Sequence, residues 1–274
     1  MHIPPESRTQ ALAHFTPLSD SEKTPLMQQD HQQFANVVNA PESRGFCTWF
    51  HTFLNKLIGV FGEKLSPGQL NRCLDRIFSE DKGWTKNGSF TVGGVEQTLF
   101  RVKESAGTTY IICAPAHDLA ESGSCAAHMA GGRSFLQTYN ALTAAFPQGQ
   151  IKVLIPVAQS NTYAFSGPRG HFTLLEVDMN NRTIQNAVLH DSKGGFVDLF
   201  YGGAERITEI FRNDGLTGND FSVTVEHRGE QGLLNGNDCG RFAAYYAKQI
   251  IAEGGLGKAN KKSAYAFFAT HFKD

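Results

Sequence analysis

Cys239 stands where a cysteine could act as a nucleophile. It follows the polar, glycine-containing segment 235–238 and precedes apolar residues at helical spacing over 241–251. This pattern predicts that Cys239 lies in the first turn of a helix. The unpaired N–H groups and the dipole of such a turn favour a thiolate, and the same N–H groups can donate to an oxyanion. A nearby base would complete the thiolate–imidazolium pair of amide and thioester chemistry.

His171 and Asp191 could supply that base and the acid that orients it. Strand-like runs over 172–178 and 183–190 flank the turn-forming stretch 179–182, which predicts an antiparallel hairpin. If the chain turns near residues 180–181, residues whose numbers sum to about 361 or 362 lie opposite each other. His171 and Asp191 meet this condition. A carboxylate beside an imidazole fixes its tautomer and stabilises the imidazolium.

Other ionisable residues of the same hairpin fit these roles less well. Glu176 and Asp178 lie toward its closed end, about 20 Å from His171 at the usual strand rise. His190 is next to Asp191 in the chain, but alternate residues of a strand point to opposite faces. We therefore expect His171 and Asp191, and not their neighbours, to serve the thiol.

The elements that position these residues form an α+β pattern, with a central, mostly antiparallel sheet flanked by helices. Small residues dominate 114–133, which looks like a loop. A helix after Pro67 is expected to bury one apolar face. Besides the hairpin, strands are predicted over 90–92, 97–102, 108–113, 151–157 and 221–227, and helices over 46–61, 67–78, 134–146, 204–212, 239–251 and 261–272.

Four segments together resemble the ubiquitin-like-protein cysteine protease clan, which includes SUMO proteases, adenovirus protease, bacterial effector deubiquitinases and related acetyltransferases. The segments are 153–156, 170–178, 190–192 and 235–240, and the resemblance covers about residues 150–255. It implies a papain-like thiol protease core with His171, Asp191 and Cys239 as catalytic residues. It also implies ubiquitin or ubiquitin-like conjugates as partners, and a secreted bacterial effector that acts in the host cytoplasm.

Two positions depart from the clan's pattern. Phe172 follows the histidine where SUMO proteases usually carry tryptophan, so SUMO specificity is not implied. Leu233 stands six residues before the cysteine, where the clan usually has the glutamine of its oxyanion hole. Gln231 is the candidate replacement, with Asn235 and backbone N–H groups as alternatives. A lost side-chain donor costs roughly 100- to 1000-fold in rate, so an efficient protease needs a substitute.

Composition argues against several other classes of protein. The chain has 25 Lys and Arg against 26 Asp and Glu, which provides no electrostatic basis for binding nucleic acid. No apolar run approaches the roughly 20 residues of a membrane span, and no Sec-type signal is visible. Five cysteines without regular spacing indicate a reducing compartment, not a disulfide framework. We expect a monomer without a cofactor.

The chain divides into three parts. Residues 1–43 are polar and lack periodicity, which predicts a disordered leader. Residues 44–85 carry an aromatic stripe at helical spacing and are expected to form a helical accessory region packed on the main domain. Residues 86–274 are expected to form the catalytic domain.

Three alternatives remain. A related acetyltransferase would use acetyl-coenzyme A and the same triad, but only 35 residues follow Cys239 and the acid is Asp191, and both points favour the protease. An inactive binding module would explain the missing glutamine at position 233. A zinc site is possible from spacing alone, but no metal is expected, because the first member ends an apolar strand; its four residues would be Cys113, His117, Cys125 and His128.

Overall fold

The structure is a computed structural model. It describes residues 61–62, 65, 67–92, 95–121, 124–129, 133–159, 171–194, 203–232, 235 and 237–272. Of the parts of 91–95 and 117–135 in this set, the backbone alone is described. The predicted leader over 1–43 and nearly all of the predicted helix over 46–61 lie outside the described residues, so both stay predictions.

Ten strands of the described chain form one mixed sheet, and six of their nine pairings are antiparallel. β7 is the central strand: it pairs with β8 along one edge and with β3 and then β4, both parallel to it, along the other. β10 extends the sheet beyond β9 in parallel. The strands are β1 (Thr85–Val92), β2 (Val95–Ser105), β3 (Thr108–Cys113), β4 (Ala116–Glu121), β5 (Ser124–Met129), β6 (Arg133–Ser134), β7 (Gln150–Gln159), β8 (His171–Asn180), β9 (Thr183–Asp191) and β10 (Thr224–His227).

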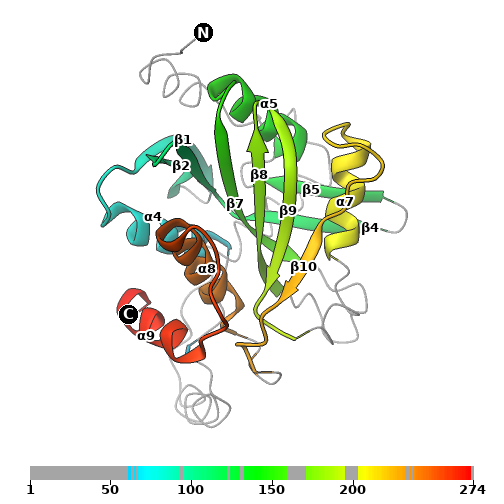
Figure 1. The fold of residues 1–274 in the computed structure, drawn as a ribbon. Coiled ribbons are helices and arrows are strands. Elements are labelled where there is room, and N and C mark those ends of the chain that lie inside the picture. The colour runs from blue at the N-terminus through cyan, green and yellow to red at the C-terminus, as the bar shows by residue number, and fades with distance from the viewer. Residues whose placement is uncertain are drawn as a thin grey trace.

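Helices cover both faces of this sheet (Figure 1). Helices α4 (Pro67–Ser79), α8 (Cys239–Glu253) and α9 (Lys261–His271) share one hydrophobic cluster with the side chains of β7 and β8 that face them. Helices α5 (Phe135–Ala145) and α7 (Gly203–Asn213) contribute to a second cluster on the other face. Alternate strand residues divide between the two, since Leu174 lies in the first and Leu175 in the second. The architecture is therefore α+β, as predicted.

The local sequence explains where the helices begin and end. Pro67 is the first residue of α4, where a missing N–H costs nothing, and Leu70, Leu74, Ile77 and Phe78 form its buried face. α8 ends at Gly254, whose φ of 77° is the left-handed conformation that glycine adopts without strain. α9 begins after Asn260, whose side chain accepts the N–H of Ser263 at 3.1 Å. These three helices confirm the predictions for their segments.

The β8–β9 hairpin has a different register from the one predicted. The turn residues are Asn181 and Arg182, both with positive φ, so the residue numbers of facing pairs sum to 363 next to the turn. A bulge between Asp178 and Met179 leaves Gln185 without a partner in the ladder and raises the sum to 364. The predicted sum of 361 or 362 is wrong. A turn at residues 181–182 instead of 180–181 raises the sum from 361 to 363, and the bulge adds one more.

The prediction of a loop over 114–133 is also wrong in part. β4 and β5 form an antiparallel hairpin in this segment, and β4 pairs in parallel with the last residues of β7. The physical reason is non-local: the edge of β7 beyond the end of β3 offers free backbone groups, and a strand there satisfies them. The proposed boundary at residue 86 falls inside β1, and α4 packs into the same cluster as α8.

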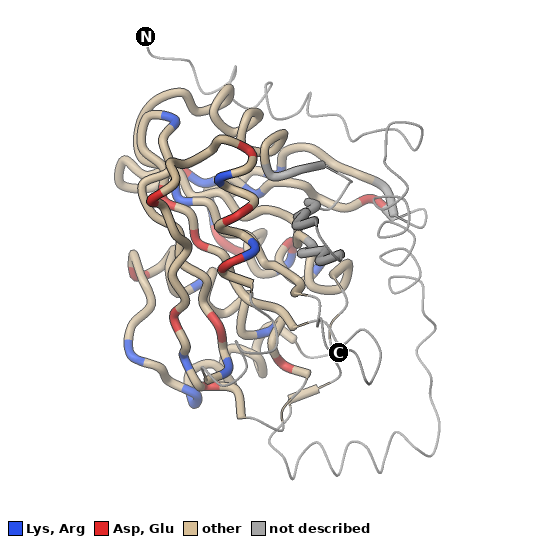
Figure 2. Tube along the Cα trace, turned by 90° about the vertical axis from the view of Figure 1, so that its right-hand side faces the viewer, with Lys and Arg blue, Asp and Glu red and all other residues tan. Residues whose placement is uncertain are grey.

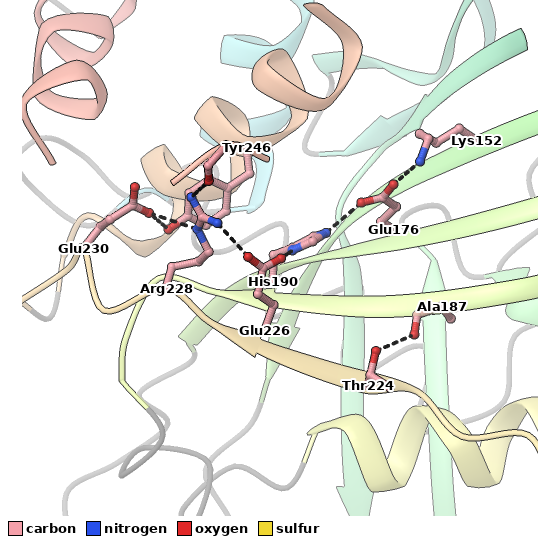
Figure 3. A network of polar contacts seen from close by, with 10 residues as sticks. Lys152, Glu176, Ala187, His190, Thr224, Glu226, Arg228, Glu230 and Tyr246 are labelled. Carbon is pink, nitrogen blue, oxygen red and sulfur yellow. Dashed lines mark hydrogen bonds and ion pairs between the residues drawn. The ribbon is translucent and has the colours of Figure 1, made fainter. Parts of the chain in front are cut away.

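A series of contacts between ionisable side chains crosses the sheet on the face that α8 covers (Figure 3). His190 lies in the middle, with Nε2 2.7 Å from Glu176 and Nδ1 2.9 Å from Glu226. Tyr246 of α8 donates its hydroxyl to Glu230, and this hydrogen bond joins α8 to the network. The members are Lys152, Glu176, His190, Glu226, Arg228, Glu230 and Tyr246. Both signs of charge are also interspersed along the described trace seen in Figure 2.

Candidate active site

The structure brings His171 and Asp191 into contact at the open end of the β8–β9 hairpin. His171 Nε2 lies 2.7 Å from Asp191 Oδ1, and both side chains are buried. Extending the observed register by one residue places Asp191 opposite Thr173, so His171 is its diagonal neighbour on the same face. The same carboxylate oxygen accepts the N–H of Lys193 at 2.9 Å, which fixes its orientation. The predicted pair is therefore present, although the register is not the predicted one.

Cys239 completes the group from the first residue of α8, as the sequence predicts. It is 1% exposed and belongs to the cluster that α8 forms with β8. His171 hydrogen-bonds its thiol. Because Nε2 is committed to Asp191, Nδ1 is the ring nitrogen available to the sulfur. The strand end, the hairpin partner and the helix start thus bring three residues together that are 20 and 48 positions apart in the sequence.

The environment of His171 favours its charged form. Burial alone would disfavour the imidazolium, but the hydrogen bonds and charges of Asp191 and Cys239 outweigh it and raise the pKa of His171 to about 9. At neutral pH the ring is therefore protonated beside the sulfur. A charged ring in this position can stabilise a thiolate and can give a proton to a leaving group.

The competing residues of the hairpin have other partners. Glu176 makes polar contacts with His190 and Lys152, and the carboxylate of Asp178 lies 2.8 Å from Lys152 Nζ. His190 faces away from Asp191, between two carboxylates on the α8 side of the sheet. These contacts engage all three residues with partners other than His171, and the expectation that none of them serves the thiol stays a prediction.

Gln231 lies near the three residues but already makes several hydrogen bonds. Its Oε1 accepts the hydroxyl of Ser192 at 2.6 Å, and its Nε2 donates to the carbonyl oxygen of Asn235 at 2.6 Å. Its backbone N–H donates to the carbonyl oxygen of Ser192 at 2.8 Å. Gln231 therefore ties the residue after Asp191 to the loop before Cys239. Its role as oxyanion donor stays a prediction.

The Asn235 amide, the alternative donor, is fully engaged. Its Nδ2 donates to Asp238 Oδ2 at 2.7 Å and to the Tyr265 hydroxyl at 3.1 Å. Its Oδ1 accepts the backbone N–H groups of Asn237 and Asp238 at 3.1 and 3.2 Å. Both amide hydrogens are thus in use, so Asn235 shapes the loop before Cys239. Leu233 lies outside the described residues.

Gln159 is a residue of this region that the sequence pattern did not single out. It pairs with His171 across the β7–β8 ladder, is 2% exposed, and donates from Nε2 to Thr173 Oγ1 at 3.1 Å. The start of α7 lies against this amide: a Cβ at Gly203 would lie 2.3 Å from Nε2, so a larger residue there would displace the Gln159 side chain. The sequence signal that could have identified Gln159 is a polar residue at the end of an otherwise apolar strand.

The described side chains include no group of three or more His, Cys, Asp and Glu placed to hold a metal ion. Of the proposed zinc ligands, Cys113 is buried, and burial raises the pKa of its thiol to about 12. The side chains of His117, Cys125 and His128 lie outside the described set. Within that set, no helix has the length and apolar character that a membrane crossing needs.

No family model matches the chain, and no curated protein matches it. Among solved structures, it is similar to a crystal structure of the Legionella pneumophila effector protein RavZ, with a TM-score of 0.50 at 13% sequence identity. That match covers 76% of this chain and 60% of the RavZ chain. Two further RavZ structures have TM-scores of 0.49 and 0.48, at 13% and 11% identity, and cover 77% of this chain and 61% and 63% of theirs. At such low identity the first likeness shows the fold alone.

Proposed function

We propose that the chain is a cysteine protease that removes ubiquitin or a ubiquitin-like modifier from target proteins. The observation that carries the proposal is the double contact of His171, which binds Asp191 through Nε2 and hydrogen-bonds the thiol of Cys239. A buried acid, a base and a sulfur at a helix start are the parts that a thiol hydrolase needs. The order His, Asp, Cys and the surrounding motifs resemble the ubiquitin-like-protein protease clan and its papain-like core.

In the proposed reaction, the Cys239 thiolate attacks the carbonyl carbon of the modifier's C-terminal glycine. The isopeptide C–N bond breaks, and the His171 imidazolium gives its proton to the leaving lysine amine. A water molecule, deprotonated by His171, then cleaves the thioester to release the modifier's carboxylate and the free enzyme. Asp191 keeps the ring oriented and stabilises its charge throughout.

Backbone N–H groups at the start of α8 are the proposed donors to the oxyanion. A helix N-terminus directs its N–H groups and its positive dipole toward the bound charge. Gln231 could add one N–H, because a primary amide has two and the contact with Asn235 uses one of them. Side-chain assistance from Asn235 is disfavoured by its engaged amide.

We further propose that the protein is a bacterial effector that acts, as a monomer, in the cytoplasm of a host cell. The fold-level likeness to an effector protein of Legionella pneumophila supports this setting. The absence of a regular cysteine framework is consistent with a reducing compartment.

The test uses C-terminal electrophile probes built on ubiquitin and on a panel of ubiquitin-like proteins. The wild-type protein should form a covalent adduct with at least one of them, located at Cys239 by mass spectrometry. Cys239→Ala should form none, whereas Cys113→Ser, a matched change at another buried cysteine, should react like the wild type. A reactive Cys239 that captures no modifier would contradict the proposed substrate. Acetylation of added protein in the presence of acetyl-coenzyme A would then favour the acetyltransferase.

A further inference from the structure

Asp238, the residue directly before Cys239, is a fully buried carboxylate that collects hydrogen bonds from four segments of the chain. Its Oδ2 accepts the backbone N–H of Phe61 and the Nδ2 of Asn235, each at 2.7 Å. Its Oδ1 accepts Nη1 of Arg241 at 3.1 Å. The Tyr265 hydroxyl of α9 lies 3.5 Å from Oδ2. The backbone at the start of α8 is thus anchored from outside the helix.

The Asp238 carboxylate does not cap α8, although Asp238 is its N-cap residue. Asp238 is the N-cap residue of α8, and an aspartate there commonly accepts an N–H group of the first helical turn. The side chain makes no such cap bond. Its oxygens are turned instead toward donors outside that turn and toward the Arg241 side chain. A buried carboxylate is costly unless such donors satisfy it, so its place beside the sulfur calls for a role other than capping.

Phe61 and Leu65, which precede α4 in the sequence, make further contacts at this anchor. The ring of Phe61 packs edge-on against Phe268, with ring centroids 5.7 Å apart, and lies 5.6 Å from the guanidinium of Arg241. Leu65 packs on Gly240, where an added Cβ would lie 3.6 Å from Leu65 Cβ. Phe61 and Leu65 therefore adjoin the first turn of α8, which carries the sulfur.

The Tyr265 hydroxyl stays protonated and can donate to the Asp238 carboxylate. Burial and the negative charge of Asp238 raise the pKa of Tyr265 to about 12, so its proton stays in place at neutral pH. Arg241 is 6% exposed and held between the rings of Phe61 and Phe272. Arg241, one of the donors, is therefore itself held by packing.

We propose that Asp238 is a positioning residue for Cys239, and that the backbone amide of Phe61 is part of the clamp that holds it. The clamp sets the direction of the Cys239 side chain toward His171. The inference rests on the proposed role of Cys239 as nucleophile. It makes Phe61, which precedes α4 in the sequence, a support of the catalytic centre, because its N–H makes one of the two 2.7 Å contacts to the carboxylate.

The first test measures the alkylation of Cys239 by iodoacetamide between pH 5 and pH 9, with the modified residue identified by mass spectrometry. Asp238→Asn should slow the reaction at pH 7 roughly tenfold or more, because several donors lose a charged acceptor. The sign is diagnostic: loss of a neighbouring negative charge alone would favour the thiolate and speed the reaction. An unchanged or faster profile in this variant overturns the positioning role.

Tyr246→Phe provides the matched control for general destabilisation. Tyr246 lies on α8 about two turns beyond Cys239, and its hydroxyl donates to the buried Glu230. The variant should melt at a lower temperature but keep the wild-type pH profile of alkylation. If it slows the reaction as much as Asp238→Asn does, the effect belongs to helix stability and the inference fails.

A pair of variants isolates the Phe61 amide. Phe61→Ala removes the ring but keeps the N–H, whereas Phe61→Pro removes both. The proline variant should react several-fold more slowly than the alanine variant, and equal rates would remove Phe61 from the clamp. These measurements need no modifier. If the wild type captures no ubiquitin-like probe but Asp238→Asn still slows alkylation, the isopeptidase proposal fails and the positioning role of Asp238 stands.

Discussion

The charge of His171 depends on Asp191, and replacing that carboxylate by an amide should lower the pKa of the ring sharply. A rise from the ordinary 6.5 to about 9 corresponds to roughly 3 kcal/mol in favour of the imidazolium. Burial acts in the opposite direction, so the two partners together supply more than this net amount. Asp191→Asn keeps the shape of the contact and removes its charge. We therefore expect the pKa of His171 to fall toward 6.5 in Asp191→Asn, and below 6.5 when Cys239→Ala is added.

The assay is a pH titration of histidine ring signals by nuclear magnetic resonance. The chain has ten histidines, so the signal of His171 is assigned as the one missing from His171→Gln. Wild-type protein should titrate near pH 9 at this residue. His190→Gln serves as the control, because His190 lies on the other face of the sheet and touches neither Asp191 nor Cys239 in its described contacts. A midpoint in Asp191→Asn that matches the wild type would refute the electrostatic argument.

The same pair links stability to pH with a definite sign. A group whose pKa is raised by folding stabilises the protein fully below its unfolded pKa and loses that effect as the pH rises through the folded value. For His171 the window runs from about 6.5 to about 9. The unfolding free energy of the wild type should therefore exceed that of Asp191→Asn near pH 6, and the difference should shrink by pH 9.5.

Three further predictions concern the frame around the site. Burial raises the pKa of Glu176, but hydrogen bonds and charges of His190 and Lys152 outweigh it and lower the pKa. Glu176→Gln should therefore destabilise the protein at pH 7 in urea unfolding, and the loss should shrink as the pH falls below the folded pKa. Phe242→Ala should cost about 3–5 kcal/mol because its side chain is fully buried, while the exposed Lys262→Ala should change little. Asp75→Ala should cost about 3–5 kcal/mol because it strands the buried Arg101, and Asp75→Ala with Arg101→Met should recover much of the loss in the same measurement.

The sequence could predict those features that depend on local pattern. The apolar spacing after Pro67 and after Cys239 is that of a helix with one buried face, and α4 and α8 lie there. Strand-like runs on either side of the turn-forming residues 179–182 predict the hairpin that carries His171 and Asp191. Each of these signals lies within about 20 residues of chain.

Contacts between distant segments left no such signal. The anchor of Asp238 joins residues 177 positions apart through Phe61 and 27 apart through Tyr265. β4 forms beside β7 and β5 pairs with β4, although many of their residues are small, because β7 offers a free edge. Gln159 and Ser192 acquire their roles from the strands and loops that meet around them. Such features are settled by tertiary packing and not by propensity.

The bulge at Gln185 shows how a small local feature decides the chemistry of the hairpin. A two-residue turn at Asn181–Arg182 makes facing pairs sum to an odd number, 363, and would set Asp191 opposite Phe172, on the face away from His171. One unpaired residue raises the sum to 364 and returns Asp191 to the face of His171. The sequence prediction allowed a sum of 361 or 362, and the even value is the one that pairs His171 with Asp191. The conclusion survived a register error of two because side chains alternate with period two, and an error of one would have reversed it.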